Sequence, residues 1–477
     1  MNTKALRQKI LDLAIHGKLV PQDPNDEPAS VLLERIRTEK ERLIKEGKIK
    51  KPKKTKAACD KPHYPYEQPK GWVWTTVGEI SKSISYGVSE SAKSKGEYKL
   101  LRITDIQNNA VDWNTVPYAD YDEHRANAYL ISDGDILFAR TGATVGKSYL
   151  VKGLQDKAIY ASYLIRVQTF NEILPEYVKY FFESGFYWDQ IQKDSVGIGQ
   201  PNVNGTTLSQ LALPIPPINE QHRIVNELGS WLNIIDAIDN GKTELQIAIK
   251  QAKSKILDLA IHGKLVPQDP NDEPANELLK RINSKAEITC DNPQYGKLPK
   301  GWCMTHIEDL FEAVSAKRVL KNNWKSNGIP FYRAREIVQL NKEGSADKDI
   351  FISEELYQEI KEKYGVPCVG DIMVSAVGSI GYTYIVKKSD LFYYKDASVL
   401  CLKNSNNLYS EFFSVWLSTP YIQEQMYKNS KGTTVDTITL EKLKNYIVPL
   451  PPVQEQHRIV AKIEELFAQL DKIEASL

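Results

Sequence analysis

The amino-acid sequence contains a long internal repeat, which constrains the fold more than any other feature. The segment Lys9–Ala29, KILDLAIHGKLVPQDPNDEPA, recurs without a single change at Lys255–Ala275. A second block, PIPPINEQHRIV at Pro214–Val225, is closely matched by PLPPVQEQHRIV at Pro449–Val460. Repeats of this kind indicate an architecture built from equivalent units. The 477 residues therefore divide into two halves with the same order of segments.

Two variable domains, residues 70–213 and 291–448, lie between the repeated blocks and share only scattered residues. The order is repeat block, variable domain and Pro-Pro block, followed by the same three again. Joining the two ends of the chain would therefore close a ring. We expect two equivalent supports that carry two different recognition surfaces. A plain tandem duplication without functional symmetry is the alternative.

Apolar residues after each Pro-Pro block follow steps of four and three, the spacing of a coiled-coil seam. The first copy continues through Leu245 and Ile249, which predicts one long helix from about Asn219 to His262, ended by Gly263. A break near Gly241 is the alternative, because glycine costs a helix about 1 kcal/mol relative to alanine. The predicted seam residues are Ile224, Leu228, Trp231 and Ile235 in the first copy and Ile459, Ile463, Leu466 and Leu470 in the second.

The seam of the second copy runs out at the carboxyl terminus, and its missing continuation is the amino-terminal segment Leu6–His16. We therefore expect the two chain ends to meet and complete a second long helix. The variable domains alternate short apolar runs, turn-rich stretches and helical patterns, which predicts mixed α/β domains. The expected fold is α+β and pseudo-two-fold symmetric, with the two variable domains separated by two long antiparallel coiled-coil helices in a circular organisation. The predicted segments are an N-terminal helical repeat (1–48) that pairs with the C-terminus, a basic linker (49–69), the first variable domain (70–213), a central helical spacer (214–290), the second variable domain (291–448) and a C-terminal spacer helix (449–477).

Composition limits the class of protein. With 42% hydrophobic and 26% charged residues, the chain resembles ordinary soluble globular proteins rather than disordered or disulfide-rich ones. No stretch approaches the roughly 18 apolar residues of a membrane helix, and the five cysteines lack the paired spacing of zinc sites. We expect a protein of the reducing cytoplasm that has no membrane partner and no metal site.

The charge balance of 62 basic against 61 acidic residues means that any binding to nucleic acid must depend on local patches. The run Lys48–Lys56 packs six lysines into nine residues. A solvated linker and a phosphate-binding segment are both compatible with this run.

The motifs that resemble catalytic sites are incomplete. Gly142–Ser148 (GATVGKS) resembles a phosphate loop but has three residues between its glycines instead of four, which favours a hairpin loop. Asp291–Tyr295 (DNPQY) superficially resembles the Asn-Pro-Pro-Tyr element of amino-methyltransferases, but Gln294 replaces the second proline. Four of the seven histidines belong to the repeated blocks, which favours helix-end and packing roles over catalysis. We expect no catalytic residue in this chain.

Polar loops of the variable domains are the candidate recognition surfaces. Arginine and lysine can pair with guanine, asparagine and glutamine can pair with adenine, and glycines let a backbone approach DNA closely. The candidates are Arg102, Arg140, Lys147, Gln200 and Asn202 in the first variable domain and Arg333, Arg335, Ser379, Thr433 and Thr434 in the second.

The repeated blocks carry a family resemblance that covers essentially the whole chain. LDLAIHGKLVPQDPNDEPASVLLERI at Leu11–Ile36, its copy at Leu257–Ile282, and the PPxxEQHRIV blocks at Pro216 and Pro451 are similar to the DNA-specificity subunits of type I restriction-modification systems. The resemblance implies that each variable domain is a target recognition domain for one half of a bipartite, asymmetric site in double-stranded DNA. It also implies that the spacer helices fix the gap between the two halves.

The same resemblance implies the partners and their cofactors. Two methyltransferase subunits, which hold S-adenosylmethionine and methylate adenine, are expected on the two equivalent supports, where the seam residues serve as spacer and partner-binding positions. Motor-endonuclease subunits, which use ATP and Mg²⁺, are expected to join for cleavage. No cofactor is expected in this chain. Two alternatives remain: the chain itself methylates DNA, or it is a duplicated scaffold for proteins alone.

Overall fold

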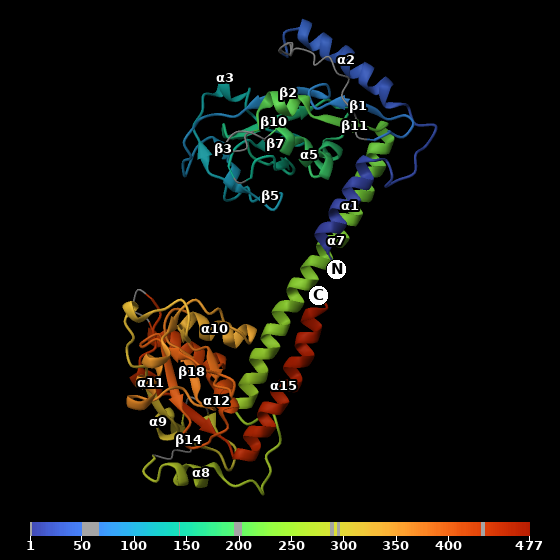
Figure 1. The fold of residues 1–477 in the computed structure, drawn as a ribbon. Helices are drawn as coiled ribbons and strands as arrows, with labels where there is room; N and C mark the ends of the chain where they lie inside the picture. Colours follow the sequence, from blue (N-terminus) through green and yellow to red (C-terminus); the bar gives the residue numbers. More distant parts are fainter. Residues whose placement is uncertain are drawn as a thin grey trace. The chain divides into compact units, whose positions relative to one another are not determined.

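The computed structural model describes residues 2–49, 66–142, 144–194, 203–286, 291–292, 296–430 and 435–477. The chain divides into two compact units, Met1–Gly241 and Lys242–Leu477 (Figure 1). Each unit contains a helical support and one variable domain. Most of the predicted basic linker, residues 50–65, lies outside the described residues.

In the first unit, helix α1 (Thr3–Ile15) packs against the first part of the long helix α7 (Ile218–Ile261) (Figure 1). Arg7 forms an ion pair with Asp236, whereas Asp26, beyond the end of α1, pairs with Arg223. The two helices therefore run in opposite directions. Apolar side chains of both helices lie in one core with the first variable domain.

The buried seam of the first unit differs from the predicted one at a single position. Ile224, Leu228 and Ile235 are buried as predicted, but Trp231 is 40% exposed and donates its indole N–H to Glu227 Oε1 over 2.8 Å. Leu232 is buried in its place. The prediction was wrong there because the seam advances by four, four and three residues, so a strict alternation assigns the wrong neighbour.

In the second unit, helix α15 (Val453–Ala475) packs antiparallel against the second part of α7. Lys253 contacts Asp471 at 2.6 Å, and Lys242 donates to the carbonyl of Leu477. Of the predicted seam residues, Ile459 and Ile463 are buried, whereas Leu466 and Leu470 are only half-buried. Phe467, which corresponds to Leu232 of the first unit, packs against the core.

Helix α7 matches the predicted long helix, and it continues through Gly241 without the alternative break. Gly17 and Gly263 follow α1 and α7 with φ of +66° and +62°, the left-handed conformation that glycine adopts at little cost. The expected meeting of the two chain ends stays a prediction. Among the described residues, no helix is long and apolar enough to cross a membrane.

The two variable domains share one strand topology despite their different sequences. Each contains a four-stranded sheet, with order β2-β10-β7-β8 in the first domain and β15-β21-β18-β19 in the second. Each also has a three-stranded sheet, β6-β3-β9 or β17-β16-β20, in which one pair is parallel and the other antiparallel. The strands of the first domain's sheets are β2 (Ser81–Tyr86), β3 (Tyr98–Leu101), β6 (Tyr118–Ala119), β7 (Ile136–Ala139), β8 (Ser148–Leu150), β9 (Ala158–Tyr160) and β10 (Leu164–Thr169). Those of the second are β15 (Glu312–Ser315), β16 (Ile329–Tyr332), β17 (Phe351–Ile352), β18 (Ile372–Ser375), β19 (Thr383–Ile385), β20 (Tyr393–Tyr394) and β21 (Val399–Lys403).

Helices and a two-stranded closure complete each domain and join it to its support. The closing pairs are β1 (Val73–Thr76) with β11 (Ala212–Ile215) and β14 (Cys303–His306) with β22 (Ile447–Leu450). The first domain has α4 (Pro175–Phe181), α5 (Gly185–Asp194) and α6 (Gly205–Gln210), and the second has α12 (Ser410–Leu417), α13 (Pro420–Ser430) and α14 (Leu440–Lys444) at matching places in the order. The remaining elements outside the variable connections are α2 (Ala29–Lys45), α8 (Ala275–Ile282), β12 (Asp291–Asn292), β13 (Gly296–Lys297), α9 (Ile307–Leu310) and η2 (Lys321–Asn323).

The domains differ most in the segment that follows the central strand of the three-stranded sheet. After β3, the first domain forms a 3₁₀ turn η1 (Ile103–Asp105), a hairpin of β4 (Ile106–Gln107) and β5 (Ala110–Val111), and the short α3 (Glu123–Ala126). After β16, the second domain forms helix α10 (Ala334–Glu343) and, beyond β17, helix α11 (Glu354–Lys363) (Figure 1). The same framework thus carries a hairpin in one domain and a helix in the other.

Candidate functional site

The repeat block and the Pro-Pro block meet at a junction that occurs once in each unit. In the first unit, the indole N–H of Trp72 donates to Glu220 Oε2 at 3.0 Å, and Gln22 Nε2 donates to Glu220 Oε1 at 3.1 Å. Burial raises the pKa of the Glu220 carboxyl, although both hydrogen bonds favour its charged form. The glutamate near the start of α7 therefore ties the support to the first variable domain.

The second junction repeats this arrangement. Trp302 donates to Glu455 Oε2 at 3.0 Å and Gln268 donates to Glu455 Oε1 at 3.1 Å, and burial again raises the pKa of the carboxyl. An aspartate–arginine pair lies beside each glutamate, with Asp26–Arg223 and Asp272–Arg458 both at 2.6 Å. The two supports are equivalent in their hydrogen bonds as well as in their sequence.

Each repeat block places its helix-ending glycine in tight contact with a proline of the junction. A Cβ on Gly17 would lie 2.3 Å from Pro69 Cγ, and a Cβ on Gly263 would lie 2.2 Å from Pro299 Cγ. The histidine before each glycine donates Nδ1–H to a backbone carbonyl of its own helix end, from His16 to Asp12 at 2.5 Å and from His262 to Asp258 at 2.7 Å.

Three predicted recognition residues of the first variable domain lie in two neighbouring loops. Arg102 follows β3, and its guanidinium and backbone N–H both donate to the Asp105 carboxylate, with Nη2 to Oδ1 at 2.7 Å. The Arg140 guanidinium lies over the Tyr86 ring at 4.9 Å. Lys147 is exposed in the β7–β8 connection, which is the hairpin loop expected for the GATVGKS segment. Gln200 and Asn202 lie outside the described residues.

A cavity of about 720 Å³ lies beside the β4–β5 hairpin, on the side of α1 and α4. One wall is a polar cluster, in which the buried Lys179 Nζ lies 2.5 Å from Glu183 Oε1 and the exposed Asn109 donates Nδ2–H to the same oxygen at 2.7 Å. Burial lowers the pKa of the Lys179 ammonium, while the glutamate opposes this shift. This cluster joins the β4–β5 turn to the end of α4.

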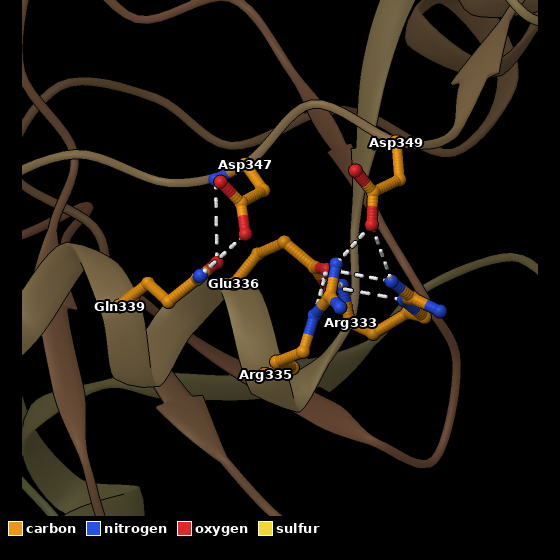
Figure 2. A network of polar contacts seen from close by, with 6 residues as sticks. All are labelled: Arg333, Arg335, Glu336, Gln339, Asp347 and Asp349. Carbon is orange, nitrogen blue, oxygen red and sulfur yellow. Dashed lines mark hydrogen bonds and ion pairs between the residues drawn. The ribbon is translucent and has the colours of Figure 1, made fainter. Parts of the chain in front are cut away.

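In the second variable domain, the predicted residues Arg333 and Arg335 lie at the start of α10. Figure 2 shows both guanidinium groups directed at the Glu336 carboxylate and at Asp349. Glu336 is 2% exposed; burial opposes its ionisation, but the hydrogen bonds from the two arginines outweigh burial and lower its pKa. Ser379 is exposed in the β18–β19 loop, whereas Thr433 and Thr434 lie outside the described residues.

Arg102 and Arg333 occupy the same topological position, directly after the central strand of each three-stranded sheet. In both cases a carboxylate three residues later holds the backbone N–H and the guanidinium together. Neither this common fixing device nor Gln339, which lies one helical turn beyond Arg335, was predicted from the sequence. The signal was present as the pairs Arg102/Asp105 and Arg333/Glu336 in the two aligned loops.

The described residues contain no group of three or more histidine, cysteine or acidic side chains that could hold a metal ion. Cys303 and Cys401 are buried and Cys368 is exposed, each without a disulfide. Of the DNPQY segment, only the strand β12 (Asp291–Asn292) is described.

Comparison with known proteins agrees with this duplicated arrangement. Residues 69–249 and 299–477 each match the family described as Type I restriction modification DNA specificity domain. The chain is 28% identical to the Type I restriction enzyme EcoAI specificity subunit of Escherichia coli, over 98% of this chain and 90% of that protein. It is 24% identical to the EcoKI specificity subunit of Escherichia coli K12, over 85% of this chain and 84% of that protein.

Among solved structures, a chain from a study of complex assembly and conformational transition of the type I R-M system matches with a TM-score of 0.61 and 19% identity, over 86% of this chain and 94% of that one. The HsdS subunit from Thermoanaerobacter tengcongensis matches with a TM-score of 0.52 and 18% identity, over 86% and 93%. These two matches show a shared fold. The two family matches cover most of the sequence, so the chain belongs to the type I restriction-modification DNA specificity family.

Proposed function

We propose that this chain is the DNA-specificity subunit of a type I restriction-modification complex and carries no catalytic residue of its own. The observation that carries the proposal is the pair of equivalent junctions, each of which presents a domain of the same topology but with a different polar element after its central strand. Each variable domain contacts one half of a bipartite site in double-stranded DNA.

The proposed DNA contacts come from the loops after the central strands and from the β-hairpin connections. These contacts are Arg102, Arg140, Lys147, Arg333, Arg335 and Ser379. Gln200, Asn202, Thr433 and Thr434, which lie outside the described residues, are further proposed contacts. Forked guanidinium groups and hydroxyl and amide side chains suit base edges and phosphates.

The two equivalent supports dock two copies of a methyltransferase subunit, since equal surfaces bind equal partners. Those partners supply S-adenosylmethionine and methylate the flipped adenine. Motor-endonuclease subunits, with ATP and Mg²⁺, join for cleavage. The spacer residues, among them Ile224, Ile235, Ile459 and Ile463, keep the supports rigid because they are buried.

The proposal is tested by sequencing the methylated adenines of a host that contains the methyltransferase subunit with and without this chain. A bipartite motif that appears only with this chain supports the proposal, and methylation that is unchanged by the chain contradicts it. Binding of S-adenosylmethionine to the isolated chain would favour the alternative of an enzyme, and no protection of DNA by the assembled complex would favour a scaffold for proteins alone.

We further propose that helix α7 sets the gap between the two half-sites. Insertion of about four residues, one helical turn, near Gly241 should lengthen the gap of unrecognised bases while both half-sites stay the same. An unchanged gap would show that the helix does not act as a ruler. Gly241 suits the insertion because it is exposed and a Cβ there would meet no atom within 4 Å.

A further inference from the structure

Helix α10 has one buried face and one polar face. Glu336 and Ile337 are buried, and the helix contacts β16, β18 and β19. Arg335, Gln339 and Lys342 follow each other at steps of four and three, so they form one stripe on the helix. Arginine, glutamine and lysine are the residue types that pair with guanine, adenine and phosphate.

Both the nitrogen and the oxygen of the Gln339 side-chain amide form hydrogen bonds with Asp347. Gln339 Nε2 donates to Asp347 Oδ2 at 2.7 Å, and the backbone N–H of Asp347 donates to Gln339 Oε1 at 3.2 Å (Figure 2). Asp347 therefore offers one acceptor and one donor side by side. Adenine offers the same pair in the major groove through N7 and the N6 amino group.

The guanidinium of Arg335 faces acceptors only. Its Nε donates to Glu336 Oε1 at 2.9 Å, and its Nη2 forms an ion pair with Asp349. Guanine likewise presents two acceptors, O6 and N7, to a forked guanidinium. Arg335 and Asp349 are both about half exposed, so another acceptor can replace this carboxylate, whereas Glu336 is buried.

We propose that α10 is the element with which the second variable domain recognises its half-site, and that Arg335 and Gln339 determine the specificity for guanine and adenine. In the free protein, Asp349 pairs with Arg335 and Asp347 hydrogen-bonds to Gln339. Both aspartates thus present hydrogen-bonding groups that resemble those of base edges. DNA binding exchanges the two aspartates for bases. This inference rests on the proposed function and adds the recognition element and its occupants.

The size of the element fits this role. The major groove accommodates an α-helix or a two-stranded β-ribbon. The second variable domain places a ten-residue helix after its central strand, and the first places the β4–β5 hairpin at the same topological position. The two domains thus offer two different elements of groove size, which suits two unrelated half-sites.

The test uses the full chain, assembled with its methyltransferase partner, and sequencing of methylated adenines. Gln339→Ala should relax the second half-site at one adenine and Arg335→Ala at one guanine. Each discrimination should fall by about 5- to 150-fold, which corresponds to the 1–3 kcal/mol of a bidentate base contact. The first half-site should stay unchanged. Lys361→Ala, an exposed change on α11, is the matched control and should alter neither half-site.

A second arm predicts a gain, which misfolding cannot produce. Asp347→Ala and Asp349→Ala remove the two competing carboxylates, although the backbone N–H of residue 347 remains. Binding of the complex to its own site in a fluorescence assay should therefore tighten severalfold with the same half-sites. The inference is overturned if Gln339→Ala and Arg335→Ala leave the second half-site intact, or if the aspartate variants bind no more tightly. In either case, the proposed function is still supported if a bipartite motif is methylated only when this chain is present. The proposed function itself is refuted if no motif is methylated with the wild-type chain.

Discussion

The junctions and the variable domains of this protein both occur twice, but the two junctions have kept the same contacts, whereas the two variable domains have not. At the junctions, the Trp72–Glu220 and Trp302–Glu455 contacts have the same length, and so do the arginine–aspartate pairs beside them. In the variable domains, strand order is kept while the polar side chains change. Equal contacts suit surfaces that must hold the same partner, and changed contacts suit surfaces that must recognise different ligands.

One aspartate is shared by the two variable domains, but its cationic partner differs between them. Asp135 and Asp371 both precede an equivalent strand, β7 or β18. Asp135 lies 3.7 Å from the buried Arg166, whereas Asp371 pairs with Lys403 at 3.0 Å. The carboxylate that fixes the turn before the strand is retained, and its cationic partner is free to differ. The framework therefore preserves backbone geometry rather than particular side-chain pairs.

The largest loss of stability is expected from substitutions of the junction tryptophans, and it should be the same at both junctions. Trp72→Ala and Trp302→Ala each remove a buried side chain, 6% and 4% exposed respectively, and each should lower the free energy of unfolding by about 3–5 kcal/mol. Urea unfolding followed by circular dichroism measures both losses. Trp231→Ala, at an exposed position, should cost far less. If the free energy lost at one junction were less than half of that lost at the other, the two junctions would not be energetically equivalent.

A smaller effect is expected at the glycines that end α1 and α7. Gly17→Ala and Gly263→Ala force alanine into a left-handed conformation, which costs about 1–2 kcal/mol, and the new methyl group also meets a proline. Gly47→Ala is the matched control, because Gly47 has φ of +70° but no atom within 4 Å of the added carbon. Thermal unfolding should rank Gly47→Ala as the mildest of the three, and equal losses would show that the proline contact is unimportant.

The smallest effect is a pH dependence at the two buried glutamates. Burial raises the folded-state pKa of Glu220 and Glu455 above the ordinary value of 4.5, so the folded protein holds these protons more tightly than the unfolded chain. Their contribution to stability is therefore greatest below pH 4.5 and falls as pH rises from 4.5 through the folded-state pKa.

Relative to the double variant Glu220→Gln and Glu455→Gln, the wild-type protein should lose free energy of unfolding between pH 5 and pH 7.5. Urea unfolding at the two pH values measures the difference. The single variants should contribute equal parts of it. A difference that grows with pH would contradict burial as the dominant influence on these carboxyl groups.

The sequence was sufficient to predict the supports because their signals are local and repeated. The helix from Asn219 to His262, the stop at Gly263 and the hairpin at GATVGKS follow from spacing and from glycine chemistry, and the structure confirms them. The prediction that Trp231 is a buried seam residue was wrong, because a helix of 3.6 residues per turn allows either Trp231 or Leu232 to face a partner helix. Packing, not periodicity, decides between them.

The candidate site was harder to predict because its contacts depend on tertiary placement. The Trp72–Glu220 hydrogen bond joins residues 148 positions apart, and no local pattern indicates it. Gln339 was missed because its significance depends on the position of Asp347, which a loop between α10 and β17 determines. Arg333 and Arg335 were identified by residue type alone, without their acidic partners.

If equivalent supports carry two independent recognition domains, one domain can be exchanged without effect on the other, and a chimera tests this. Residues 291–448 are replaced by the corresponding domain of a related specificity subunit, and methylated adenines are sequenced in a host that contains the assembled complex. We expect a new second half-site, with the first half-site and the gap unchanged. Alteration of both half-sites would contradict the independence of the two domains.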